Sequence, residues 1–442
     1  MNRESRHPGW LWSALLLLLL VPGAARAQAS FQIGFAKENV DWGSKLTMGG
    51  YGVYFGLPSA TRQNGEGLHD SLYASAVAIR GTGPSTLVIV ALDSVGMGSA
   101  SIARIRSKVA SQLPGQPVKL IVTASHSHQA PDTMGIWGAL PFFTGRNGSY
   151  MKHIEQQTAN AVVKAIQSAV PAYLSYAITS KPNSSTTKAT APERKDDAVT
   201  VVVARTPEGQ LLGTLTQWSA HPTILGANNN TLSSDFVGTF RYFMEQQYGG
   251  VHVYVNGAMA DEYVAGGDGL WTDPFPLGKR DPQVTDGYER VAAVGRDLFV
   301  RVSQVLPAAQ PLTSNAVGHS EASFPITNTN LLFQQVSDWN IIEKDISNNK
   351  AQTEMSWFRI GGLQGFTVPG EMSAAGTRLL RAELVSRGAE ATLVIGMADD
   401  WLGYMMMPDE YDTDRYSYNR TLSPDRSAGQ TIVNQAKALP VR

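Results

Sequence analysis

The sequence contains no cysteine and few charged residues. None of the 442 residues is Cys, and Asp, Glu, Lys and Arg together make up 17%. Disulfide bonds and a lipid-bearing cysteine are therefore excluded. The 36 Lys and Arg nearly balance the 37 Asp and Glu, which gives a formal net charge of −1. Because a nucleic-acid-binding surface needs an excess of basic residues, no nucleic-acid partner is expected.

Long apolar runs are also scarce, and the main one lies at the N-terminus. Residues 1–27 combine a charged start, a short apolar core and the small-residue ending Ala25-Arg26-Ala27, which is typical of a secretory signal peptide. Cleavage after Ala27 leaves 442 − 27 = 415 residues. No other run reaches the roughly eighteen apolar residues of a membrane span. We therefore expect a secreted or periplasmic bacterial protein whose mature chain has no transmembrane segment.

Strand-like and helix-like runs alternate along the rest of the chain. The turn signal Thr206-Pro207-Glu208-Gly209 separates two strand-like runs, which predicts a hairpin and hence a mixed sheet. The alternation predicts an α/β fold in which mixed β-sheets are layered with helices. Strands are expected within residues 85–96, 118–128, 198–222, 251–259, 357–371 and 391–399. Helices are expected within residues 99–113, 149–170, 233–249, 287–306 and 373–388.

Two of the eight histidines, His126 and His128, follow the apolar run at residues 118–122. If the strand continues through them, residues two apart point to one face, with Cα atoms about 6–7 Å apart. This spacing suits two ligands of one metal ion, or one ligand with a second imidazole beside it. It suits equally a pair of hydrogen-bonded histidines at the end of a strand.

Three more polar residues follow strand-like runs. His221 lies in Ser-Ala-His-Pro-Thr, Glu371 in Val-Pro-Gly-Glu, and Tyr404 in Leu-Gly-Tyr. The C-terminal ends of strands are where sites form in open α/β sheets, so a metal site is expected there. Two imidazoles and a carboxylate are a common ligand set for catalytic zinc, and a phenol near a divalent cation can ionise and join them. Taken singly, each residue also has a structural interpretation: a strand-end histidine, an acid at a helix N-terminus and a core tyrosine.

Five short motifs, in this order, resemble the neutral ceramidase family. An opening segment, FQIGFAKENVDW at residues 31–42, is also similar to that family. The resemblance extends from residue 31 to about residue 420. The five motifs are TASHSHQAPDT (123–133), SAHPT (219–223), LSSDFVG (232–238), VPGE (368–371) and GYMMMPDEYDTDRYS (403–417).

This resemblance implies a zinc amidohydrolase that cleaves the N-acyl bond of ceramide. It makes His128 an imidazole beside the metal that carries a proton to the leaving amine. It makes Tyr416, which lies twelve residues after Tyr404, the phenol that stabilises the oxyanion. The four residues that it assigns as ligands of Zn²⁺ are His126, His221, Glu371 and Tyr404.

The chain departs from the family's motifs in two places. Asn256, Gly257 and Asp261 match an Asn-x-Gly-Asp segment, but Tyr263 stands where the family has a serine near the zinc. Arg194 is the candidate for the family's active-site arginine. In the first motif, Ala130 replaces a glycine and is preceded by Gln129. The family's C-terminal β-sandwich has no counterpart, so residues 28–442 are expected to form a single catalytic domain.

These differences leave three functions open. The first is cleavage of ceramide or a related lipid, and the second is an esterase or amidase of the same fold that acts on a non-ceramide substrate, such as a small amide. The third is a catalytically silent zinc-binding homologue. The apolar loop at residues 134–143 could line a lipid-accepting groove and allows peripheral contact with a membrane surface. Exposure of Trp137, Phe142 and Phe143 would favour that groove.

Overall fold

The computed structural model describes residues 30–43, 45–52, 65–139, 142–180, 185–187, 196–257, 259–260, 262–264, 269–275 and 278–441. The expected signal peptide, Arg194 and Asp261 lie outside these residues, as does the side chain of Tyr263. Among the described residues, no helix is both long enough and apolar enough to cross a membrane.

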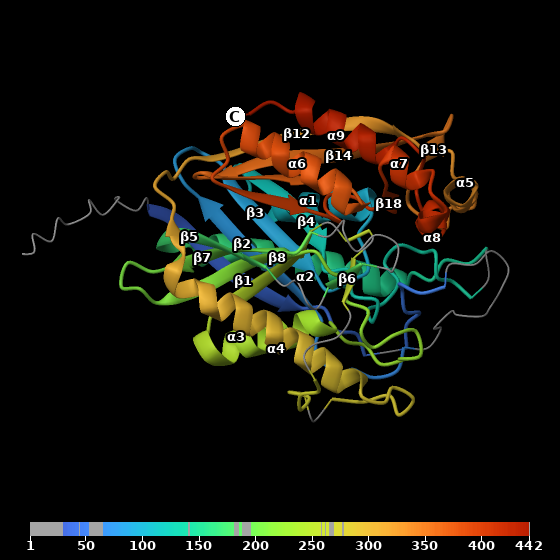
Figure 1. Ribbon diagram of the computed structural model, residues 1–442, viewed down its shortest axis with the longest axis horizontal. Coiled ribbons are helices and arrows are strands. Elements are labelled where there is room, and N and C mark those ends of the chain that lie inside the picture. The colour runs from blue at the N-terminus through green and yellow to red at the C-terminus, as the bar shows by residue number, and fades with distance from the viewer. Residues whose placement is uncertain are drawn as a thin grey trace, which may run out of the picture.

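Two large β-sheets pack face to face, with helices on both outer sides (Figure 1). The first sheet has the strand order β4-β3-β2-β1-β5-β7-β8-β9, and β11 pairs with β5. The pairs β3/β4 and β8/β9 are parallel and the other pairs are antiparallel, so the sheet is mixed as predicted. Its strands are β1 (Ser30–Asn39), β2 (Tyr73–Arg80), β3 (Thr86–Leu92), β4 (Val118–Ala124), β5 (Val170–Ser180), β7 (Ala198–Arg205), β8 (Leu211–Trp218), β9 (Val251–Asn256) and β11 (Gln310–Pro311).

The second sheet has the order β12-β14-β15-β17, and the short β13 pairs with β14. Its strands are β12 (Val317–Thr327), β13 (Ile346–Ser347), β14 (Lys350–Ile360), β15 (Leu363–Thr367) and β17 (Ala391–Ile395). Two small pairs complete the described strands: antiparallel β6 (Ser185–Thr187) with β10 (Glu262–Val264), and parallel β16 (Glu371–Met372) with β18 (Tyr404–Met405).

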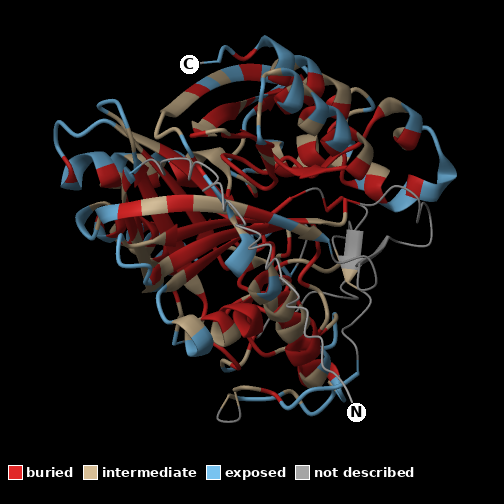
Figure 2. Ribbon diagram, turned by 60° about the vertical axis from the view of Figure 1, so that its left-hand side comes forward, coloured by how far each residue is buried: buried red, intermediate tan, exposed pale blue. Residues whose placement is uncertain are grey.

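Apolar side chains from both sheets form a shared core between them. Ile33, Ile89 and Val253 of the first sheet belong to the same buried cluster as Phe358 and Leu393 of the second. Strands that are buried on both faces have continuous apolar sequences. Strand β7, with the sequence AVTVVVAR, is of this kind, so apolar and polar residues do not alternate along it. Figure 2 shows the buried residues concentrated in the strands and on the inner sides of the helices.

Helices cover the outer faces of both sheets. Helices α1 (Ser99–Gln112) and α2 (Gly148–Gln167) pack on one half of the first sheet, and α3 (Phe236–Tyr248) and α4 (Gly287–Val305) on the other half. Helices α6 (Ala374–Ser386) and α9 (Ala428–Ala438) cover the second sheet. The short helices are α5 (Leu331–Asp338), α7 (Pro408–Tyr411), α8 (Ser417–Thr421), η1 (Leu306–Ala308) and η2 (Asp414–Tyr416). The predicted α/β class of mixed sheets layered with helices is confirmed.

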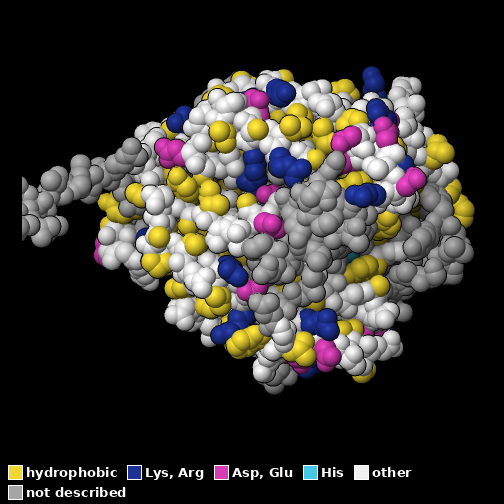
Figure 3. Space-filling model, in the orientation of Figure 1, with side chains coloured by type: hydrophobic (Ala, Val, Ile, Leu, Met, Phe, Trp, Pro, Cys, Tyr) yellow, Lys and Arg dark blue, Asp and Glu magenta, His cyan; other side chains and the backbone are white. Residues whose placement is uncertain are grey.

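The described surface carries charges of both signs. On the face in Figure 3, Lys and Arg side chains are interspersed with Asp and Glu, which agrees with the near balance of charge in the sequence. Some of these opposite charges pair on the surface: Arg426 and Asp412, both exposed, form a salt bridge of 2.6 Å.

Candidate metal centre

The histidine pair lies in a turn after the end of β4. The strand ends at Ala124, and His126 adopts the left-handed conformation with φ of 67°. The prediction that both histidines project from one face of a strand is therefore wrong in its backbone geometry. The two rings nevertheless meet, with their Nε2 atoms 3.0 Å apart. Because a left-handed non-glycine residue costs about 1–2 kcal/mol, the surrounding contacts must hold His126 in place.

One side chain braces the segments that carry two of the histidines. The side-chain amide of Asn256, at the end of β9, donates to the carbonyl of Ser125, and its Oδ1 accepts from the backbone N–H of Ala220 at 3.2 Å. These contacts fall on the residues immediately before His126 and His221. Asn256 therefore fixes the two histidine-bearing turns relative to each other.

The hydrogen bonds define which nitrogen of His126 carries a proton. Its Nδ1 lies 2.5 Å from the carbonyl oxygen of Val95, and since a carbonyl can only accept, Nδ1 is the donor. The lone pair of its Nε2 therefore points toward the other imidazoles. One ring nitrogen from each of the buried residues His126, His128 and His221 lies within 4.8 Å of the others.

A buried carboxylate completes this cluster. Oε2 of Glu371 lies 3.1 Å from Nε2 of His221 and 3.6 Å from Nε2 of His126. Its other oxygen, Oε1, accepts a hydrogen bond of 3.2 Å from the indole N–H of Trp401. Glu371 follows β15 of the second sheet, whereas the histidines follow β4 and β8 of the first. The cluster therefore forms where the C-terminal ends of strands from the two sheets meet.

Burial and charge keep His126 and Glu371 in the protonation states that metal binding requires. Burial lowers the pKa of His126 to about 4, so its imidazole is neutral at pH 7. Burial works to raise the pKa of Glu371, but His126, His221 and Trp401 together lower it below its usual value. Metal ligands must be deprotonated, and the neutral imidazole of His126 beside the ionised carboxylate of Glu371 meets that condition. The residues present therefore fit a divalent cation such as Zn²⁺.

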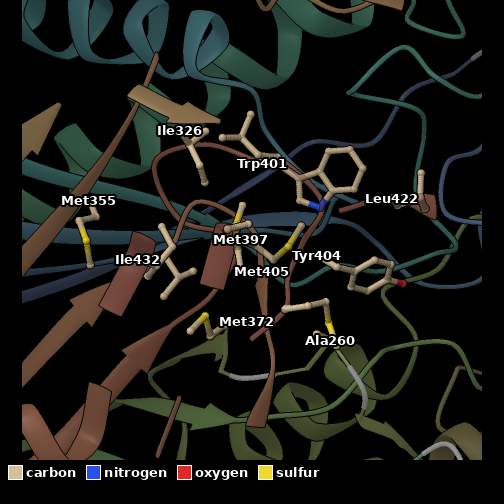
Figure 4. Close-up of a cluster of buried hydrophobic side chains, with 14 of the residues drawn as sticks. Ala260, Ile326, Met355, Met372, Met397, Trp401, Tyr404, Met405, Leu422 and Ile432 are labelled. Atoms are coloured by element: carbon tan, nitrogen blue, oxygen red, sulfur yellow. The ribbon is translucent and has the colours of Figure 1, made fainter. Parts of the chain in front are cut away.

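One of the two predicted tyrosines, Tyr404, is a direct neighbour of the carboxylate of this cluster. Tyr404 of β18 is in register with Glu371 of β16, so the two residues are direct neighbours in a parallel strand pair. Figure 4 shows the ring of Tyr404 extending away from Met397 and Met405 with its hydroxyl at the far end. Tyr416, in η2, belongs to the same buried apolar cluster as Tyr404.

The altered first motif has a structural role. Gln129 is buried, its Oε1 accepts from Nδ2 of Asn229 at 2.9 Å, and its Nε2 donates to the carbonyl of Gly226 at 3.2 Å. Gln129 therefore ties the turn that carries His128 to the loop that follows His221. Ala130 is buried in the core cluster under α1 and α2.

The apolar loop after this motif is divided between core and surface. Trp137 is buried at 3% exposure, whereas Phe142 and Phe143 are exposed at 65% and 61%. Of the three aromatic residues whose exposure would favour a lipid-accepting groove, the two phenylalanines are therefore exposed and Trp137 is not. Leu140 and Pro141 of the loop lie outside the described residues.

Three contributors to the centre were not recognised in the sequence. The carbonyl of Val95 could not have been found, because any residue type offers one. Trp401 could have been, since a tryptophan near Tyr404 in a buried segment needs an acceptor for its N–H. His69 was overlooked: its Nε2 lies 2.6 Å from Asp273 and its Nδ1 3.2 Å from Asp70.

Asp70 connects His69 to the metal centre. It accepts hydrogen bonds from the hydroxyl of Ser233 at 2.5 Å and from the backbone N–H of Ser234 at 2.8 Å. The carbonyl of Ser233 in turn accepts from the hydroxyl of Ser127, at 2.8 Å. Ser127 lies between His126 and His128, so the His69 network supports the same turn from behind.

Comparisons with known proteins agree with this architecture. The crystal structure of neutral ceramidase from Pseudomonas aeruginosa is similar with a TM-score of 0.76 at 16% identity, over 94% of this chain and 76% of that one. The structure of a ceramidase complexed with C2 is similar with a TM-score of 0.74, also at 16% identity, over 93% of this chain and 75% of that one. The search of curated proteins gave no match. The sequence profile described as "Neutral/alkaline non-lysosomal ceramidase, N-terminal" matches residues 31–267, which is more than half of the chain. The chain therefore belongs to the neutral/alkaline non-lysosomal ceramidase family.

Proposed function

We propose that the protein is a zinc-dependent amidohydrolase that cleaves the N-acyl bond of ceramide or a related lipid. The observation that carries this proposal is the buried cluster of His126, His221 and Glu371, whose donor atoms converge in a chain of the ceramidase family. Fully buried histidines and a carboxylate are expensive to hold together unless they serve a common partner.

In this proposal the ion is held by His126, His221 and Glu371, with Tyr404 as the fourth ligand. Burial keeps the imidazole of His126 neutral at pH 7, the neighbours of Glu371 lower the pKa of its carboxyl, and Tyr404 is the strand neighbour of Glu371. A bound zinc ion would supply Lewis acidity, which lowers the pKa of water and polarises the scissile carbonyl.

His128 is proposed to move protons during the reaction. It is the most exposed of the three clustered histidines, at 8% against 3% for His126 and 0% for His221. Its ring is held edge-on to that of Tyr51, with centroids 4.8 Å apart. A Cβ atom at Gly50 would lie 2.4 Å from Cγ of His128, so only glycine leaves room for the ring. A fixed imidazole beside the metal can accept a proton from water and deliver it to the leaving amine.

Tyr416 is proposed to donate a hydrogen bond from its phenol to the oxyanion that develops on the substrate carbonyl. Its burial in the same apolar cluster as Tyr404 supports this role, since a donor in a site that excludes water acts more strongly on a developing charge.

The proposed substrate suggests a contact with lipid surfaces. Phe142 and Phe143 are exposed, and the ring of Phe142 lies 4.5 Å from that of Trp339, between centroids. We propose that these rings touch the membrane from which a lipid substrate is taken, in a protein that the signal-like residues 1–27 direct to the periplasm or outside the cell.

The test is fatty-acid release from ceramide by the purified mature protein, with its zinc content recorded before and after chelation. Release that chelation abolishes and zinc restores is the expected result. Replacement of His126 by Asn should remove both metal and activity, whereas His153→Gln, a change on α2, should affect neither. A protein that holds one zinc ion but releases no fatty acid would reject ceramide and favour a smaller amide or an ester.

A further inference from the structure

We propose that Trp401 is a positioning residue that fixes which oxygen of Glu371 binds the metal. The indole N–H donates to Oε1 at 3.2 Å, while Oε2 lies 3.1 Å from Nε2 of His221. With Oε1 held in this way, Glu371 offers the ion a single oxygen. This inference rests on the proposed metal centre and adds a residue that the ligand set does not include.

The chemistry of the two groups makes this arrangement directional. An indole N–H is a donor only, so its partner must present an acceptor. Both residues are buried, with Trp401 at 5% and Glu371 at 2% exposure, and a buried polar atom without a partner is unfavourable. Any rotation of the carboxylate that brought both oxygens to the ion would strip the indole of its acceptor.

The segment that carries Trp401 is held in an unusual conformation. Met397 and Asp399 are left-handed non-glycine residues, with φ of 54° and 64°. The segment is tied to β4: the backbone N–H of Asp399 donates to the carbonyl of Val122 at 2.8 Å, and the hydroxyl of Thr123 donates to the carbonyl of Gly396 at 2.8 Å. Strained residues persist only where the surroundings over-determine them.

Asp400 fixes the backbone of Trp401. Its Oδ1 accepts from the backbone N–H of Trp401 at 3.0 Å and from that of Ser99, at the start of α1, at 3.1 Å. Its Oδ2 accepts from the hydroxyl of Thr353 in β14 at 2.9 Å. Both sheets and a helix therefore determine where the indole lies.

Neighbouring rings set the orientation of the indole. Trp137 and Phe333 lie with their ring centroids 6.3 Å and 6.2 Å from that of Trp401. Figure 4 shows Trp401 at the edge of the methionine-rich cluster, with its nitrogen directed toward the interior. Since β4 also leads into His126, one strand positions both the first histidine ligand and the residue that orients the carboxylate.

The direct test compares Trp401→Phe with Trp137→Phe, which removes an indole from the same cluster. Zn²⁺ and Co²⁺ affinities are measured by chelator competition, and thermal unfolding of the metal-free proteins is recorded alongside. Loss of a group that orients a ligand typically weakens metal affinity about 10–100-fold, which is expected for W401F and not for W137F. A loss shared by both variants would indicate a packing effect, and wild-type affinity in W401F would overturn the proposal.

A double substitution tests the orientation itself. In E371Q the single amide oxygen stays with the indole, so the amide NH₂ faces the imidazoles and repels a cation. In E371Q/W401F the amide can turn its oxygen to the ion, so the double variant should bind Co²⁺ no more weakly than E371Q alone. Additive losses would overturn the proposal. Metal binding that requires His126 and His221 but not Trp401 would reject this inference alone, whereas no metal binding by the wild type would reject the metal centre as well.

Discussion

The side-chain amide of Asn256 donates to the carbonyl of Ser125, the residue before His126. The same side chain accepts from the backbone before His221, so it spans the two turns from which the proposed ligands project. The hydroxyl of Tyr254 also donates to its Oδ1, at 3.2 Å, and holds the amide in this orientation. Asn256 thus contributes to the centre through the backbone of the two turns.

Asn256→Asp should loosen both turns. The substitution keeps Oδ1 as an acceptor but places a second oxygen against the carbonyl of Ser125, where a donor is needed. A lost buried hydrogen bond with an unsatisfied partner costs about 1–3 kcal/mol, so we expect a loss of that size in the free energy of unfolding, together with weaker metal binding. Urea unfolding and metal competition measure the two effects. Asn434→Asp, at an exposed position of α9, adds the same charge and should change neither, and wild-type behaviour of N256D would contradict the bracing role.

His128→Asn should separate metal binding from turnover. His128 is proposed to carry protons rather than to bind the ion, so zinc content and thermal stability should remain close to those of the wild type. Loss of a general acid–base residue typically lowers the rate about 10²–10⁴-fold. Zinc analysis and fatty-acid release by the same preparation give both quantities. If zinc were lost together with activity, His128 would be a ligand, as its place among the three clustered nitrogens also permits.

The buried His69 should give the protein a pH-dependent stability. Burial works to lower the pKa of His69, but its hydrogen bonds to Asp273 and Asp70 raise it to about 9 from the usual 6.5. Because the folded state holds this proton more tightly than the unfolded state, the stabilisation is complete below pH 6.5 and is lost as the pH rises through 9. The full effect is of the order of 3 kcal/mol. The free energy of unfolding of His69→Gln should fall less than that of the wild type between these pH values, and parallel pH profiles would contradict the assignment.

Replacing the exposed phenylalanines should affect catalysis only at a lipid surface. In the double variant F142S/F143S, hydrolysis of ceramide in vesicles should decrease, because a buried phenylalanine contributes about 1.5–3 kcal/mol to partitioning from water. Hydrolysis of a water-soluble short-chain ceramide should be unchanged. The control L379S/V385S removes two exposed apolar side chains from α6 instead. Equal losses on both substrates would indicate a damaged site rather than a membrane contact.

Much of the layered fold could be predicted because its central strands are continuous apolar runs bounded by turn signals. The hairpin of β7 and β8 and the crossover from β3 through α1 to parallel β4 follow from local patterns. Strand β12, with the sequence VGHSEASFPIT, was not predicted, because it is partly exposed and carries many polar residues. Its pairing with β14 comes from tertiary context, which overrides local preference.

The meeting of His126, His128, His221 and Glu371 could be predicted from the sequence, but the geometry of that cluster could not. His221 and Glu371 were expected at the site because they follow strand-like runs. The sequence around His126, however, does not show that this residue leaves the strand with a positive φ. The supports from Val95, Asn256 and Trp401 come from segments far from the residues they hold, so only the folded chain reveals them.

The proposed ligands come from both sides of the seam between the sheets: His126 and His221 follow strands of the first sheet, and Glu371 and Tyr404 form the small β16/β18 pair, whose strands follow β15 and β17 of the second. An ion bound by all four would act as a cross-link over this seam, since separating the sheets would break its coordination. Binding would then add RT ln(1 + [M]/Kd) to the stability of the docked state, where [M] is the free metal concentration. During folding, the ion could be captured only after the sheets had met, so loading with metal would mark the last step of assembly.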